Sequence, residues 1–95
     1  MKRSLDDKHL FEELQSVAER LFNEVRREEG LFQTGSCIHN GKRVLLINNR
    51  QPLQECIAAL AKEIAAAGGD RLYLKPAVRA EVERFSGITA VDLKP

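Results

Sequence analysis

The dipeptide Asn40-Gly41 constrains the fold of this chain more than any other feature of its sequence. Both residues tolerate the positive φ that a type I′ turn requires, so the dipeptide predicts a β-hairpin with arms at residues 31–39 and 42–48. The first arm is largely polar and is interrupted by Gly35, which is typical of an edge strand. The second arm contains a continuous apolar run, which is typical of a strand covered on both faces.

A two-residue turn also fixes how the two arms pair. The predicted cross-strand pairs are His39 with Lys42, Ile38 with Arg43, and Cys37 with Val44. In this register Cys37 is expected to point toward the core beside an apolar neighbour. His39 is expected to lie exposed at the tip of the hairpin.

The N-terminal segment carries a long helical pattern. Ser4 and Asp7 resemble a capping box, and Gly30 stands where a helix would end in the left-handed conformation. Apolar residues recur between them at steps of three and four: Leu10, Phe11, Leu14, Val17, Ala18, Leu21, Phe22 and Val25. The pattern predicts one helix at residues 5–29, about 37 Å long. Since a globule of this size is about 30 Å across, we expect the helix to extend beyond its own domain.

A second helix is predicted after the hairpin. Pro52 suits its first turn, and Gly68-Gly69 supplies its end. One apolar stripe runs along it, made of Leu53, Cys56, Ile57, Leu60, Ala61 and Ile64. This pattern is typical of a helix that lies on a sheet.

The C-terminal part predicts one further strand and one further helix. Residues 71–74 are interpreted as a third strand, and Pro76 opens a helix that Gly87 closes. Residues 89–93 are either a fourth strand or an ordered tail, so the structure of residues 88–95 stays open.

Together these elements predict a single α/β domain over residues 1–95, with the helix at 5–29 and an α/β part at 31–93. After the long helix and the hairpin, β-α-β units are expected to form a small three- or four-stranded mixed sheet covered by helices.

Charge and hydropathy exclude several classes of protein. The 15 Lys and Arg nearly balance the 14 Asp and Glu, which gives a net charge of +1 and argues against a dedicated basic nucleic-acid-binding domain. The chain has no run of about 18 apolar residues, and acidic residues follow its first five positions, where a signal peptide needs an apolar segment. We therefore expect a soluble cytoplasmic protein without a membrane partner.

The cysteines and histidines predict neither a metal site nor a catalytic site. Cys37 and Cys56 are too few for a disulfide framework and are expected to be reduced core thiols. Together with His9 and His39 they match no zinc-ligand spacing. The sequence contains no complete catalytic constellation, so we expect no cofactor and no enzymatic activity.

Polar residues follow two of the predicted strands. Asn48, Asn49 and Arg50 follow the second hairpin arm, and Lys75 follows the predicted third strand, with Arg79 one helical turn later. If the two strands are parallel neighbours, their carboxyl ends and the helix N-termini beside them meet at one edge of the sheet. The pattern favours a site for a small anion or a nucleotide, although polar loops and helix capping explain the same residues.

One part of the chain resembles a known family. The run Gly41–Asn48, Pro52 and the segment Leu60–Ile64 are similar to the hairpin, loop and active helix of IrrE-type zinc metallopeptidases. In that family the helix carries H-E-x-x-H, whereas here Lys62 and Ala66 stand at the two histidine positions and only Glu63 matches. The resemblance implies at most a shared scaffold without the metal. The whole chain also resembles small bacterial proteins with a hairpin followed by an amphipathic helix, and this second resemblance implies no activity.

The first functional hypothesis is a non-enzymatic interaction or assembly module that forms a homodimer through its N-terminal helix. The predicted interface is a seam of apolar residues on that helix: Leu10, Leu14, Val17, Leu21 and Phe22. The alternative is that the same helix covers its own sheet. The second hypothesis is the anion or nucleotide site.

A third hypothesis is contact with RNA. The basic residues that support it are Lys42, Arg43, Arg71, Lys75, Arg79 and Arg84. Only Tyr73 offers a nearby ring for stacking a base, so this hypothesis is the weakest of the three.

Overall fold

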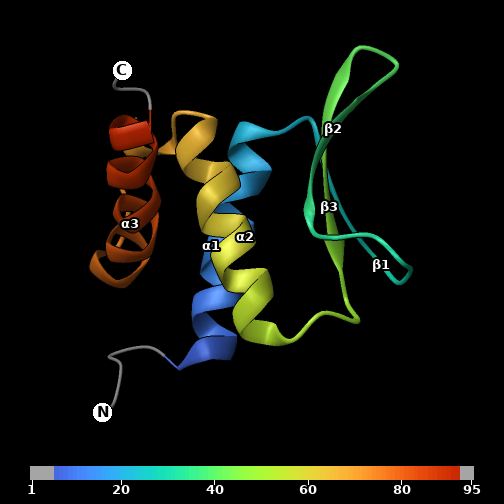
Figure 1. Ribbon diagram of the computed structural model, residues 1–95, viewed down its shortest axis with the longest axis horizontal. Coiled ribbons are helices and arrows are strands. Elements are labelled where there is room, and N and C mark those ends of the chain that lie inside the picture. The colour runs from blue at the N-terminus through green and yellow to red at the C-terminus, as the bar shows by residue number, and fades with distance from the viewer. Residues whose placement is uncertain (1–5, 93–95) are drawn as a thin grey trace.

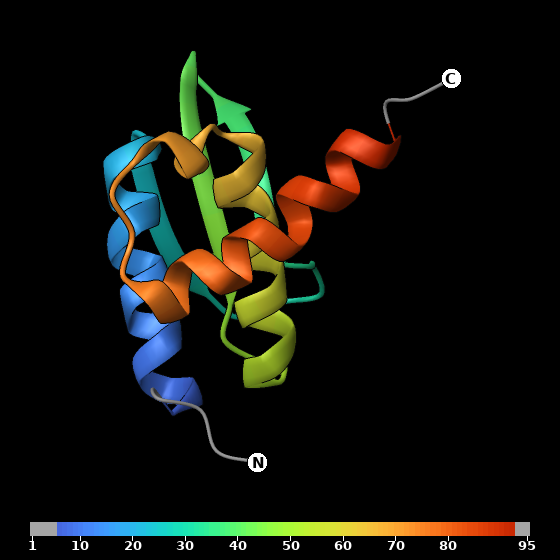
Figure 2. The same ribbon diagram turned by 90° about the vertical axis from the view of Figure 1, so that its left-hand side faces the viewer.

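The computed structural model describes residues 6–92 and contains a three-stranded mixed sheet with three α-helices (Figure 1). In chain order the elements are α1 (Asp7–Leu21), β1 (Glu24–Glu28), β2 (Gly35–His39), β3 (Lys42–Asn48), α2 (Leu53–Ala66), the 3₁₀ turn η1 (Gly69–Arg71) and α3 (Pro76–Asp92). Figure 1 shows three layers: the sheet, the pair α1 and α2, and then α3. Figure 2 shows α3 crossing in front of α1 and α2. The predicted fold class, α/β with a small mixed sheet, is confirmed.

The hairpin and its register are confirmed as well. Asn40 and Gly41 have φ values of 53° and 78°, as a type I′ turn requires. The pairs His39–Lys42, Ile38–Arg43 and Cys37–Val44 all occur. The sheet has the order β1-β3-β2, so β3 is central and β2 is an edge strand.

The predicted helix at residues 5–29 is wrong at its C-terminal end, because the chain leaves the helix after Leu21. Phe22 is already extended, and Asn23 bonds Arg43 twice: its backbone N–H donates to the Arg43 carbonyl, and its Oδ1 accepts from the Arg43 amide. Glu24–Glu28 then runs parallel to β3. These hydrogen bonds to the central strand outweigh the helical propensity of a Glu- and Arg-rich segment, and the sheet therefore begins at residue 24 instead of 31.

The N-terminus of α1 is capped by a residue other than the predicted one. The carboxylate of Asp6 accepts a hydrogen bond from the His9 amide at 2.8 Å, and Ser4 lies outside the described residues. At 15 residues the helix is about 22 Å long. It does not extend beyond the domain.

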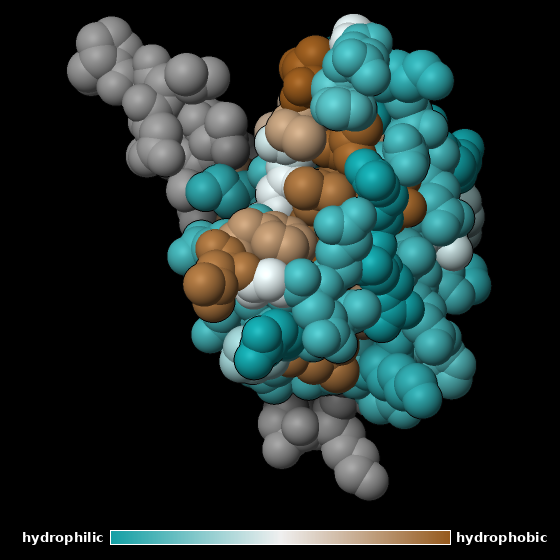
Figure 3. Space-filling model, turned by 90° about the vertical axis from the view of Figure 1, so that its right-hand side faces the viewer, coloured by the Kyte–Doolittle hydropathy of each residue, from teal (hydrophilic) through white to brown (hydrophobic). Residues whose placement is uncertain are grey.

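All three helices lie on one side of the sheet (Figure 1). Leu45 and Ile47 of β3 point to that side, are fully buried and belong to the same hydrophobic core as the buried residues of the helices. Because side chains alternate along a strand, Val44 and Leu46 point to the opposite side, which no described helix covers. The prediction of a strand covered on both faces holds at Val44, which is 2% exposed, but not at Leu46, which is half-buried. Figure 3 looks onto this open side and shows hydrophobic side chains among hydrophilic ones.

The second helix is confirmed. It runs from Leu53 to Ala66 with Pro52 at its N-cap, and Gly68 after it adopts the left-handed conformation with φ of 85°. Cys56 and Leu60 belong to the predicted apolar stripe and are buried in the core.

The predicted third strand at residues 71–74 is absent, because β1 and β2 already occupy both sides of the central strand. Gly69–Arg71 instead form a 3₁₀ turn that leads to α3. That helix begins at Pro76 as predicted but continues past Gly87 to Asp92. Residues 89–92 are thus helical, and residues 93–95 lie outside the described part of the chain.

Candidate functional site

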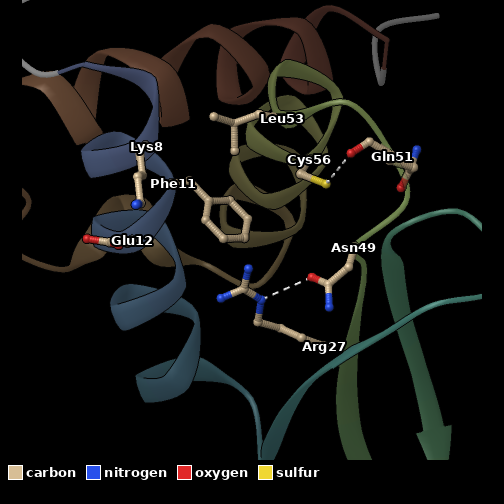
Figure 4. A pocket seen from close by; sticks show the side chains of 8 residues that line it. All are labelled: Lys8, Phe11, Glu12, Arg27, Asn49, Gln51, Leu53 and Cys56. Atoms are coloured by element: carbon tan, nitrogen blue, oxygen red, sulfur yellow. Dashed lines mark hydrogen bonds between the residues drawn. The ribbon is translucent and has the colours of Figure 1, made fainter.

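A cleft opens where the parallel strands β1 and β3 reach their carboxyl ends (Figure 4). We call it the strand-end cleft. It has a volume of about 290 Å³, near the lower end for small-molecule sites. It is lined by Lys8, Phe11 and Glu12 of α1, Arg27 of β1, Asn49 and Gln51 of the loop after β3, and Leu53 and Cys56 of α2.

Arg27 projects from β1 into this cleft and is held there by two contacts. Its Nε donates to Oδ1 of Asn49 at 3.2 Å, and its guanidinium stands 5.0 Å from the centre of the Phe11 ring. Figure 4 shows the side chain lying between α1 and the loop after β3. The sequence pattern places residue 27 in a helix, so it gives no sign of this site.

The charges around the cleft favour a small anion weakly. Lys8 and Arg27 contribute positive charge, and Glu12 beside them offsets part of it. The N-terminus of α2 adds unpaired amides, since no described side chain caps it. All three charged residues are exposed, so salt screens any attraction that they exert on an anion.

Asn48 was predicted as a ligand residue, but its side chain has a structural role. It is only 4% exposed. Its side-chain amide donates to the carbonyls of Gly30 and Phe32, and its Oδ1 accepts from the Arg50 amide at 3.0 Å. These bonds tie the loop between β1 and β2 to the end of β3, so the side chain is not free to bind a ligand.

The two predicted clusters at the strand ends do not converge. Lys75 donates to Glu13 of α1 at 3.0 Å, and Arg79 pairs with Glu83 on α3. Both lie in the helical layers, because the strand that was expected to precede them does not exist. Asn49 lines the strand-end cleft, as does Gln51, which follows it in the same polar loop. Arg50 is exposed and does not line the cleft.

The predicted interface on the first helix lies in the core of the domain. Leu10, Leu14 and Phe22 are buried, and Val17 and Leu21 are partly buried against the same core. The α1 helix covers its own sheet and packs against α2 and α3. The apolar seam is thus not available to a second copy, and this part of the interface prediction is wrong.

The two cysteines differ in environment. Cys56 is buried as predicted, and its thiol lies 3.4 Å from the Asn48 carbonyl, to which it donates. Cys37 is exposed, so its predicted core position is wrong: it points with Val44 to the open side of the sheet. In the part of the chain that the structure describes, no three or more His, Cys, Asp or Glu residues gather as a metal site would require.

The basic residues of the RNA hypothesis are divided between two layers. Lys42 and Arg43 lie on β3, and the Arg43 guanidinium stands 4.9 Å from the centre of the Phe22 ring. Arg79 and Arg84 lie on α3, beyond the α1 and α2 layer (Figure 1). The arrangement does not gather the positive charges on one surface.

The sequence pattern predicts that the first hairpin arm is an edge strand, and β2 does lie at one edge of the sheet. We define the β2 edge as the side of residues 35–39 that faces away from β3. The strand contains no Asp, Glu, Lys or Arg, and Ile38 on it is 69% exposed. Uncharged and exposed edge strands are templates for pairing with another strand.

Comparisons with known proteins find no matching family model, no matching curated protein and no matching solved structure. The resemblance to IrrE-type peptidases therefore stays a hypothesis from the sequence. In the structure, Oε1 of Glu63 accepts a hydrogen bond from Ser36 Oγ at 2.8 Å. Among the described helices, none is long and apolar enough to cross a membrane.

Proposed function

We propose that this chain is a non-enzymatic protein-interaction or assembly module whose contact surface is the β2 edge. The observation that carries the proposal is an uncharged edge strand on which the apolar residue Ile38 is exposed. Partners that recognise such edges add a strand to the sheet through main-chain hydrogen bonds. The first helix, which was the expected contact surface, is occupied by the core.

The hydrogen bonds of β3 define which groups the β2 edge offers. Both backbone groups of Arg43 bond to Asn23 on the β1 side of the central strand. In an antiparallel ladder, hydrogen-bonded and non-bonded pairs alternate, so the pair Ile38–Arg43 is non-bonded and so is Ser36–Leu45. The N–H and C=O groups of Ser36 and Ile38 therefore point outward.

The available edge ends at Thr34. The Thr34 amide, directly before the strand, is already bonded: it donates to Oε1 of Gln51 at 2.7 Å. An added strand thus meets two residues with free donors and acceptors, Ser36 and Ile38. This short segment favours a modest, register-specific contact.

Selection from a random peptide library displayed on phage tests the proposal. We expect the selected peptides to bind wild type, and their affinity for Ser36→Pro to fall at least about tenfold, because proline removes an outward N–H. The change spares the bonds to β3, so the variant is expected to keep its circular dichroism spectrum. Ser36→Ala is the matched control and is expected to bind like wild type. Peptides that bind Ser36→Pro unchanged, or no selectable peptide for a monomeric wild type, would contradict a contact at the β2 edge.

A second candidate function is weak binding of a small anion in the strand-end cleft. The observation that favours it is the placement of Arg27 between Phe11 and Asn49, beside the uncapped N-terminus of α2. Inorganic phosphate at millimolar concentration is expected to raise the melting temperature of wild type but not of Arg27→Gln. Arg50→Gln is the control, since Arg50 does not line the cleft. If sodium chloride at equal ionic strength has the same effect as phosphate, no specific site exists.

A further inference from the structure

We infer that the partner of the β2 edge is the β2 edge of a second copy, paired antiparallel about a two-fold axis. The inference rests on the proposed function and names the partner for it. Pairing of this kind joins two three-stranded sheets into one six-stranded sheet. It also leaves the covered and open faces of the two copies on matching sides.

The outward groups select one register. Opposing Ser36 of each copy to Ile38 of the other uses the free N–H and C=O groups of both residues and forms four hydrogen bonds. If the partner strand is shifted toward Thr34, it meets the Thr34 amide, which already donates to Gln51. A shift the other way meets the turn residue Asn40, which has left-handed φ. Only the first register pairs all the outward groups of residues 36 and 38 with strand residues.

In this register the two Cys37 residues face each other across the two-fold axis. The two residues form a non-bonded pair, in which the Cα atoms of an antiparallel ladder stand about 4.5 Å apart. A disulfide accepts Cα separations from about 4.4 to 6.8 Å. Cys37 is exposed in the single chain, so two such thiols meet on the open side of the sheet.

The covered side of the sheet suits the same pairing. Ile38 lies next to Ser36 of the partner there, so its exposed side chain gains a neighbour. Ser36 bonds to Glu63 of α2, and Ala59, one turn earlier on the same flank of α2, is small and half-buried. The small side chain of Ala59 adds little bulk to this flank of α2.

Charge also permits self-pairing at this edge. Residues 35–39 contain no Asp, Glu, Lys or Arg, so antiparallel pairing brings no like charges together along the ladder. If an edge strand carried a charged residue, two-fold pairing would bring that charge close to the identical charge of the second copy. The β2 edge is free of this penalty.

Sedimentation velocity and thiol cross-linking together test the inference. At micromolar concentration wild type is expected to sediment as a dimer, and Ser36→Pro is expected to raise the dissociation constant about tenfold or more, since two of the four hydrogen bonds are lost. Diamide then oxidises the paired Cys37 thiols to a disulfide and takes up their two electrons and two protons. A covalent dimer is expected for wild type and Cys56→Ala, and none for Cys37→Ser.

Each outcome decides the inference. A monomeric wild type overturns it, and so does a dimer that Ser36→Pro leaves intact or that diamide does not link through Cys37. A monomer that still binds selected peptides at the β2 edge overturns only the identity of the partner and leaves the proposed function standing. A monomer that binds no such peptide overturns both.

Discussion

The two edges of the sheet are built differently, although both flank the same central strand. Every residue of β1 except Val25 is charged, whereas β2 carries no formal charge. On β1, Arg26 lies 3.3 Å from Glu24 and 3.4 Å from Glu28. Charged side chains of this kind protect an edge strand from pairing with another chain. The difference supports the proposal that a partner adds to the β2 edge and not to β1.

The edges also differ in what holds them to the helices. Arg27 of β1 contacts α1 through the Phe11 ring, and Val25 packs against the core. On β2 the contact with α2 is the bond from Ser36 to Glu63. The β2 strand is thus held mainly by β3 and by the turn. It is exposed enough to bind and still has a fixed register.

The first prediction tests the strand that both edges share. Leu45→Ala is expected to lower the free energy of unfolding by about 2–5 kcal/mol, because Leu45 is fully buried and its truncation leaves a cavity. Urea unfolding measures the change. Leu46→Ala is the matched control on the open face, where the side chain is only half-buried and the loss should be smaller. Equal losses would mean that the two faces of β3 are equally covered.

The second prediction tests the turn that creates the β2 edge. Gly41→Val is expected to destabilise the fold by about 1–3 kcal/mol, since φ of 78° at this position strains a β-branched residue. Gly41→Asn is the control, because asparagine tolerates left-handed φ. The measurement is again urea unfolding. A neutral Gly41→Val would show that the hairpin does not depend on the type I′ turn.

The hairpin was predictable because its signal is local. Asn40 and Gly41 are adjacent, and the turn alone fixes the register of its two arms. β1 was not predictable in the same way, because its only apolar residue is Val25 and its Glu and Arg residues favour a helix. The strand forms through parallel hydrogen bonds to β3, about twenty residues later in the chain. Sequence periodicity does not register such a distant partner.

The candidate site was predictable only in part, for the same reason. Asn49 was placed correctly at the end of a parallel strand, but its partner Arg27 comes from the strand that the periodicity missed. Lys75 was assigned to the site because a third strand was expected before it. Cys37 was assigned to the core because its neighbour Val44 is apolar, yet an apolar run alone does not show which faces of a sheet are covered.

The third prediction removes the protection of the charged edge. The double variant Glu24→Thr, Arg26→Thr is expected to change the free energy of unfolding by at most about 1 kcal/mol, because the ion pairs are half-exposed. The measurement is urea unfolding combined with light scattering, which should detect larger assemblies than wild type forms. The control is Glu12→Thr, a charge removed from α1. No new assembly in the double variant would mean that the charges of β1 do not close this edge.

The last prediction has the smallest effect on stability and addresses the open edge. Ile38→Glu is expected to change the free energy of unfolding by only about 0.5 kcal/mol, because Ile38 is 69% exposed. In the proposed pairing, however, residue 38 lies beside Ser36 of the partner and hence near the partner's Glu63. The new carboxylate is therefore expected to dissociate the dimer through like-charge repulsion.

The matched variant Ile38→Lys places a positive charge at the same position and is expected to dissociate the dimer less, because Glu63 of the partner attracts it. Adding Glu63→Gln should weaken the Ile38→Lys dimer and strengthen the Ile38→Glu dimer. Sedimentation at low and high salt measures all four variants, and the difference between Glu and Lys should shrink as salt screens both interactions. If Glu and Lys at position 38 dissociate the dimer equally, residue 38 does not lie near Glu63 of the partner. The register derived from the outward groups of β2 would then be wrong, even if the chain still forms a dimer.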